Sequence, residues 1–210
     1  MAFADYDPDL TDPDLTAIAP DAATAKILVA GGFGVGKTTL VGTISETVPL
    51  RTEELITEAS VGVDDMAGVE TKTTTTVAMD FGRITLSQAL VVYLFGAPGQ
   101  DRFWFMWDDL SRGALGAVVL ADTRRLESCF ASVDFFEHRG IPFALGVNCF
   151  DGRCEEDPDE IRAALDLSPD VPLVLCDARD KESVKGVLLA LLEHVMRGLA
   201  AEAAADRQPV

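Results

Sequence analysis

The stretch KILVAGGFGVGKT, residues 26–38, decides the fold of this chain. A short apolar run, typical of a buried strand, ends in glycines and leads directly into a segment of helical character that reaches about Thr47. Residues 31–38 match the pattern GxxxxGK[ST], in the strand-to-helix context that this pattern requires. Backbone N–H groups of such a turn can point at phosphate oxygens, helped by the helix N-terminus. The stretch therefore predicts a phosphate-binding loop.

Each part of this loop has an expected role. Lys37 would neutralise the β and γ phosphates and assist catalysis, and the hydroxyl of Thr38 would ligate Mg²⁺. The glycines would let the backbone approach the phosphates closely. The predicted binding residues of the loop are Gly31, Gly34, Val35, Gly36, Lys37, Thr38 and Thr39.

Strands and helices alternate along the rest of the chain. We expect helical segments near 101–112, 124–139, 157–166 and 181–198, between strands at 26–31, 77–86, 89–95, 114–121, 142–148 and 173–176. The pattern predicts a three-layer α/β fold of about six mostly parallel strands flanked by helices. Ligands of such sheets bind at the carboxyl ends of strands, and each candidate binding motif of this chain follows such an end.

The length of 210 residues suits one domain at 26–198. Residues 1–25 hold six Asp and three Pro, which predicts a disordered acidic tail or a short motif for a basic partner. We expect a flexible tail at 199–210. The formal net charge of −18 argues against nucleic-acid binding and against unaided docking on anionic lipid.

Neither a basic-then-apolar leader nor an apolar run of membrane-spanning length is evident. The four cysteines lack CxxC spacing and are interpreted as reduced thiols. We therefore expect a cytoplasmic protein that reaches a membrane only through a partner.

Three stretches, GGFGVGKTTL (31–40), TKTTTTVAMDF (71–81) and FGAPGQDRF (95–103), resemble the bacterial Ras-like small GTPases. The resemblance covers about 26–198 and is greatest to the gliding-motility (MglA-like) branch, within it to the actinobacterial conservon-type GTPases. It implies a Ras-like P-loop NTPase fold and bound Mg²⁺ with GTP or GDP. It also implies a switch segment that becomes ordered only when the triphosphate is bound.

Two loops would select the base. Asn148-Cys149-Phe150-Asp151 resembles the NKxD motif, in which the carboxylate, here Asp151, accepts hydrogen bonds from guanine N1 and N2. The stretch 176–179, Cys-Asp-Ala-Arg, resembles the SAK loop, whose Ala backbone N–H meets guanine O6. Asn and Asp in loops also cap turns, which is the ordinary interpretation of the pair. The predicted base-binding residues are Asn148, Asp151, Asp177, Ala178 and Arg179.

By the same resemblance, Thr76 would ligate Mg²⁺ and touch the γ-phosphate, with Thr74 and Thr75 as close competitors. An exposed Thr-rich strand is the plain alternative. Gln100 would orient the attacking water, and Gly99 would offer its N–H to the γ-phosphate.

Three positions depart from the pattern. Gly96 stands where Ras relatives carry a metal-holding carboxylate, although Pro-Gly-Gln is common at this place in the bacterial branch. Asp122 either compensates for the missing carboxylate or is a turn residue. Thr75 replaces the arginine that the gliding-motility relatives carry, and Cys149 replaces the motif Lys that steadies the phosphate loop. We expect slow hydrolysis, stimulated by a partner.

The segment 103–107, Phe-Trp-Phe-Met-Trp, holds more apolar side chains than one helix face can bury. Either Phe103 and Met106 pack on the sheet while the rest cover a helix, or Trp104 or Trp107 faces a partner. In the resembling branch the partners are homodimeric roadblock-type (LC7) regulators, which suggests a role beside a membrane sensor-kinase complex. A non-catalytic pseudo-GTPase scaffold is the alternative function, and a P-loop ATPase is a weaker one.

Overall fold

The computed structural model describes residues 22–48, 50–57, 74–99, 105–150 and 156–205; of these, 50–57 and 74–78 are described as backbone. Gln100 and Asp151, two of the predicted site residues, lie outside the described residues, as does the acidic segment before residue 22.

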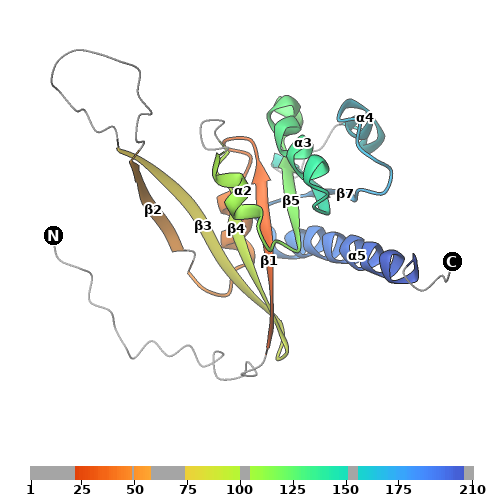
Figure 1. The fold of residues 1–210 in the computed structure, drawn as a ribbon. Coiled ribbons are helices and arrows are strands. Elements are labelled where there is room, and N and C mark those ends of the chain that lie inside the picture. The colour runs from red at the N-terminus through yellow and green to blue at the C-terminus, as the bar shows by residue number, and fades with distance from the viewer. Residues whose placement is uncertain (1–21, 49, 58–73, 100–104, 151–155, 206–210) are drawn as a thin grey trace, which may run out of the picture.

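A seven-stranded sheet in the order β2-β3-β4-β1-β5-β6-β7 forms the centre of the fold (Figure 1). β1 pairs in parallel with β4 and β5, and the parallel ladder continues through β6 to β7. β3 runs antiparallel to both β2 and β4. The strands are β1 (Ala23–Gly31), β2 (Leu50–Thr57), β3 (Thr74–Ser87), β4 (Leu90–Gly96), β5 (Gly116–Ala121), β6 (Phe143–Asn148) and β7 (Leu173–Cys176).

Helices cover both faces of the sheet because its central strands are apolar on both sides. Every residue of β5 and β6 is buried, as expected for parallel strands inside a three-layer fold. On one face lie α1 (Lys37–Ile44) and α5 (Lys181–Ala205). The other face packs against α2 (Phe105–Ser111), the 3₁₀ helix η3 (Thr123–Cys129), α3 (Phe130–Arg139) and α4 (Pro158–Ala164).

The predicted α/β class and the mostly parallel sheet are confirmed, and each of the six predicted strands is present. The prediction missed β2, which pairs along β3 as the outermost strand. β1 begins at Ala23 rather than at Lys26, so the domain starts earlier than predicted.

Helix α5 continues to Ala205, past the predicted end at 198. Residues 199–205 are Leu, Glu and Ala, which have high helix propensity, so the first part of the predicted flexible tail is helical instead. Within the described part of the chain, no helix combines the length and apolar character needed to cross a bilayer.

Candidate functional site

The loop between β1 and α1 has the backbone that its glycines predict. Gly31, Gly34 and Gly36 have φ angles of 127°, 74° and 108°, a region that side-chain-bearing residues rarely adopt. The space is also closed: a Cβ on Gly31 would collide with the carbonyl oxygen of Leu120, and one on Gly36 would lie 2.7 Å from Nδ2 of Asn148. Both the positive φ angles and the lack of space for a Cβ therefore require glycine in this loop.

Lys37 is the first residue of α1, and its side chain folds back onto this loop. Its Nζ donates hydrogen bonds to the carbonyl oxygens of Gly31 at 2.8 Å and Gly32 at 2.7 Å. Burial lowers the pKa of Lys37 to about 8, and the nearby carboxylate of Asp80 partly opposes this shift. An ammonium group desolvated in this way is prepared to bind an anion, because a bound phosphate would replace the lost hydration.

Thr38 contacts a carboxylate that the sequence did not assign to the site. Its Oγ1 donates a hydrogen bond of 2.5 Å to Oδ2 of Asp80. Asp80 lies on β3 and pairs with Gly96 on β4, and a Cβ at position 96 would be 3.0 Å from the Cβ of Asp80. A carboxylate thus lies beside Gly96, on the neighbouring strand, and contacts Thr38. Asp80 was not among the predicted site residues, because the sequence pattern alone does not say which residue of a distant segment it faces.

Gly99 brings the end of the β4 segment onto the phosphate loop. A Cβ on Gly99 would collide with Nζ of Lys37 and lie 2.9 Å from the carbonyl oxygen of Gly31. Gly99 therefore lies against the phosphate loop, and its contact with a γ-phosphate stays a prediction. Gln100 follows directly in the chain, outside the described residues.

Asn148 ties three predicted parts of the site together. It is buried at the end of β6, donates from Nδ2 to the carbonyl oxygen of Val35 at 2.9 Å, and accepts at Oδ1 from the N–H of Ala178 at 3.0 Å. The phosphate loop and the loop after β7 are thus held by one side chain. The prediction that Asn148 and Ala178 share the site with the phosphate loop is consistent with this geometry.

Two further base-loop residues pair with each other. Arg179 donates to Oδ1 of Asp177 through its Nε at 3.0 Å and to Oδ2 through Nη2 at 2.9 Å. The hydrogen bonds from Arg179 lower the pKa of Asp177 below its usual range. Asp177 thereby orders the turn that places Ala178.

Thr76 is not brought beside Thr38 in this conformation. It lies in the extended β3, paired with Leu55 of β2, and four residues before Asp80. Four residues of strand span about 13 Å, so the backbone of Thr76 is well separated from the Thr38–Asp80 pair. The antiparallel ladder with β2 holds the Thr-rich segment in this extended form. Thr39, also predicted to bind, is exposed on the first turn of α1.

Asp122 does not take the place of the missing carboxylate at Gly96. It is 1% exposed and accepts hydrogen bonds from the backbone N–H of Arg124 at 3.1 Å and from the Arg124 side chain at 2.8 Å. These bonds lower its pKa, although burial opposes the shift.

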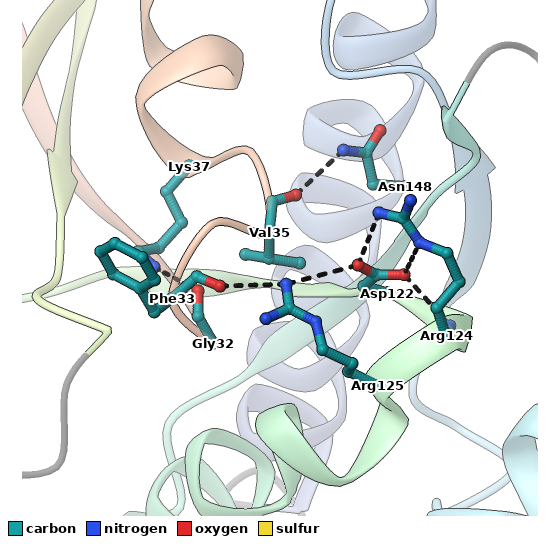
Figure 2. Close-up of polar contacts among 8 residues, drawn as sticks. All are labelled: Gly32, Phe33, Val35, Lys37, Asp122, Arg124, Arg125 and Asn148. Atoms are coloured by element: carbon teal, nitrogen blue, oxygen red, sulfur yellow. Dashed lines mark hydrogen bonds and ion pairs between the residues drawn. The ribbon is translucent and has the colours of Figure 1, made fainter.

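Arg125 approaches the same carboxylate at 3.6 Å and also reaches the phosphate loop, where its Nη2 donates to the carbonyl oxygen of Phe33 at 3.2 Å (Figure 2). Neither arginine was predicted from the sequence to belong to the site.

The aromatic segment divides between core and surface. Trp107 is 2% exposed, stacks edge to face on Phe135, and donates from Nε1 to the carbonyl oxygen of Pro98 at 3.3 Å. The suggestion that Trp107 faces a partner is therefore wrong. Phe105, which the helix turns outward, is 58% exposed. Phe103 and Trp104 lie outside the described residues.

The oxygen donors at the end of the phosphate loop fit a hard divalent cation. The hydroxyl of Thr38 and the carboxylate of Asp80 are neighbours at the first turn of α1, and Mg²⁺ is usually bound by one or two such groups together with phosphate oxygens. A magnesium ion at this position needs no nitrogen or sulfur ligand.

A glycine-lined phosphate loop at the carboxyl end of β1, with the Lys37 side chain folded onto it and Asn148 bracing it, defines a nucleotide-binding P-loop domain. The profile of a family described as "conserved hypothetical ATP binding protein" matches residues 29–198, and the chain belongs to this family.

Two kinds of known protein are similar to this chain. An uncharacterized protein of Methanocaldococcus jannaschii is 31% identical over 125 residues, which is 59% of this chain and 68% of that protein. The G domain of the T. maritima FeoB iron transporter is similar in structure with a TM-score of 0.57 at 19% identity, covering 82% of this chain and 99% of that one.

The larger cytosolic domain of the same T. maritima transporter gives a TM-score of 0.58 at 18% identity, with 82% of this chain covered. This chain spans 64% of that domain. Identity this low concerns the fold alone. The predicted likeness to small GTPases is thus confirmed for the P-loop fold, and the gliding-motility branch stays a prediction.

Proposed function

We propose that this chain is a regulatory GTPase that binds GTP or GDP with Mg²⁺, changes conformation between the two states, and signals to partner proteins. The observation that carries the proposal is the hydrogen bond of Thr38 to Asp80 at the end of the phosphate loop. A scaffold that had lost its nucleotide would have no use for a carboxylate placed against this hydroxyl.

Thr38 and Asp80 are the residues that would hold the metal, with the predicted Thr76 joining them in the triphosphate state. When bound, Mg²⁺ would neutralise charge on the β and γ phosphates. Asp80 and Thr76 share strand β3, so a cation held at Asp80 is connected to the Thr-rich segment through one continuous stretch of backbone. This connection supports a switch in which the Thr-rich segment leaves the β2 ladder when the triphosphate binds.

Guanine is the proposed base, although the family description refers to ATP. Asn148, the last residue of β6, links the phosphate loop to the loop containing Ala178 through its two hydrogen bonds, which supports a base site beside these loops. Asp151, three residues after Asn148 in the chain, would accept hydrogen bonds from guanine N1 and N2, and the N–H of Ala178 would face O6. The hydrogen bond that Ala178 N–H now makes to Asn148 would then be shared or exchanged.

Hydrolysis is proposed to be slow without a partner. Gln100 would orient the attacking water, and Lys37 would stabilise charge that develops on the phosphates. An arginine finger supplied from outside is worth about 10³–10⁵ in rate in other GTPases, and Thr75 stands where the resembling branch carries its own. A roadblock-type regulator acting on the switch segments is the proposed partner, with a membrane sensor-kinase complex reached through it. Phe105, which is exposed and follows Gln100 by five residues, would lie within such a surface.

Calorimetric titration of the full chain with GTP, GDP and ATP, each with and without Mg²⁺, tests the proposal. We expect GTP and GDP to bind and Mg²⁺ to tighten both, with the Thr38→Ala variant losing most of the metal effect. Preferential ATP binding would overturn the guanine assignment and favour an ATPase. Absence of binding to all three would favour the scaffold.

Single-turnover phosphate release, with and without a roadblock-type protein, tests the catalytic part. A slow basal rate that rises with the partner is expected. A rapid rate from the protein alone would contradict the need for an external group.

A further inference from the structure

The segment that follows β5 docks on the phosphate loop at two points. Arg125 donates to the carbonyl oxygen of Phe33, a residue 92 positions away in the chain. Ser128 fills the space beside Gly32: a Cβ on that glycine would collide with Oγ of Ser128 and lie 2.6 Å from its Cβ. That buried Oγ has no hydrogen-bond partner among the residues that the structure describes. The segment therefore packs closely enough to restrain the conformation of the phosphate loop.

Asp122 holds this segment in position. The N–H of Arg124 bonds to its carboxylate, which begins the 3₁₀ helix, and the Arg124 guanidinium bonds both carboxylate oxygens. Arg125 has φ −149° and ψ 53°, outside the helical region, which breaks the helix locally. Its Nη2 lies 3.6 Å from the Asp122 carboxylate and at the same time donates to the carbonyl oxygen of Phe33 (Figure 2).

We propose that Arg125, anchored by Asp122, is a positioning residue that fixes the Phe33–Gly34 peptide of the phosphate loop for binding nucleotide phosphates. This role rests on the nucleotide binding of the proposed function. The carbonyl of that peptide belongs to Phe33 and its N–H to Gly34, so a cation on the carbonyl polarises the group that donates from Gly34. Hydrogen bonds in a chain strengthen one another in this way, and charged donors give the strongest bonds.

Charge around the loop supports the same role. Asp122 carries one negative charge and its two arginines carry two positive charges, which leaves a surplus of one positive charge beside the phosphate loop of a chain whose net charge is −18. Position 149, from which the resembling proteins reach the loop with Lys, holds a Cys whose thiol donates to the carbonyl oxygen of Val147, two residues earlier. Arg125 thus provides a cationic contact to the loop from a different strand end.

The test uses the full chain with Arg125→Ala, Arg125→Lys and Asp122→Asn, and with Arg112→Ala as the control. Arg112 is a surface arginine paired with Asp109, so its loss removes the same charge without a contact to the loop. Affinities for GTP, GDP and guanosine are measured by calorimetry, and melting curves check that each variant is folded.

We expect Arg125→Ala to weaken GTP and GDP binding by about tenfold and to leave guanosine binding unchanged, because guanosine has no phosphate. Arg125→Lys keeps the charge and is expected between Arg125→Ala and the parent. Asp122→Asn separates position from charge: it makes the site more positive, yet we expect it to weaken nucleotide binding because Arg125 loses its anchor. Tighter binding by Asp122→Asn would overturn the positioning role.

Hydrogen exchange of the nucleotide-free protein gives a second measurement that needs no nucleotide. Exchange at residues 32–35 is expected to speed up in Arg125→Ala and to stay at the parent rate in Arg112→Ala. Unchanged exchange, or GTP affinity within twofold of the parent, would overturn the inference. If the parent itself binds no nucleotide, the proposed function fails, and the exchange result still decides whether Arg125 orders the loop.

Discussion

Asp80 and Gly96 face each other across the antiparallel pair of β3 and β4, and the side chain of Asp80 takes up the space that a side chain at 96 would enter. Thr38 binds this carboxylate at 2.5 Å. In the proposed function, Asp80 on β3 provides the carboxylate that is missing from Gly96 on β4. The pairing register places Asp80 directly opposite Gly96, so that a carboxylate on β3 can lie where one on β4 would otherwise be.

Asp80→Asn is expected to reduce the effect of Mg²⁺ on GDP affinity by about 10- to 100-fold, the usual cost of losing a group that supports a bound metal. GDP affinity in Mg²⁺ and in chelator gives this ratio directly. Glu202→Gln, an exposed charge on α5, is the matched control. Moving the carboxylate back, with Asp80→Gly and Gly96→Asp together, is expected to restore much of the effect. Gly96→Asp alone, with Asp80 kept, is expected to weaken the metal effect, because its side chain meets Asp80 at about 3 Å. A parent-like metal effect in Asp80→Asn would remove Asp80 from the site.

Nucleotide affinity is expected to fall as the pH rises above about 8, because that is the pKa of Lys37 in the free protein. Phosphates favour charged Lys37, so binding at higher pH must take up a proton, and affinity drops by up to about tenfold per pH unit. Calorimetry at pH 9 in two buffers of different ionisation enthalpy should show uptake of about one proton. Binding with no proton uptake at pH 9 would contradict the low pKa.

The same pKa sets a trend in the stability of the free protein. Between about pH 8 and the ordinary value of 10.5, Lys37 is neutral when folded and protonated when unfolded. The unfolded state then binds more protons, so this residue makes the free energy of unfolding rise with pH across that window, and its penalty is complete below pH 8. Urea midpoints at pH 7.5 and 9.5, compared with those of Lys37→Met, isolate this contribution. The parent should gain stability relative to the variant at the higher pH.

Asn148→Ala is expected to lower the free energy of unfolding by about 1–3 kcal/mol, because the carbonyl of Val35 and the N–H of Ala178 both lose a buried partner. Denaturant midpoints measure the loss, and weaker nucleotide binding should accompany it. Asn148→Asp keeps the acceptor for Ala178 but places a carboxylate against a carbonyl oxygen, so we expect it to be at least as harmful. A tolerated Asn148→Asp would show that the bond to Val35 contributes little.

Two glycines should respond to alanine in opposite directions. Gly99→Ala forces a methyl group against Lys37 and the loop backbone, and overpacking of this kind typically costs about 1–3 kcal/mol. Gly186 lies within α5 with open space around it, so Gly186→Ala is expected to add about 0.5–1 kcal/mol of stability. Melting temperatures compare the two, and nucleotide binding should be lost only in Gly99→Ala.

Local signals were sufficient for most of the fold. The buried runs of β5 and β6 and the glycines after β1 are determined by side chains close in sequence, so their elements were predicted correctly. The strand β2 was missed because residues 50–57 mix polar and apolar side chains, and its pairing with β3 provides the evidence for it. The extent of α5 was underestimated because an alanine-rich end can be helix or tail, and packing of the preceding turns decides between them.

By itself, the sequence determined the phosphate loop, its Lys37 and Thr38, and the α/β order of the elements, because these depend on backbone freedom and on neighbours within a few residues. Tertiary structure alone decided that Asp80 serves Thr38, that Asp122 anchors arginines instead, and that Arg125 reaches Phe33. Those contacts join residues tens of positions apart. They depend on strand register and on where a loop lands, and neither is specified by any short pattern of residues.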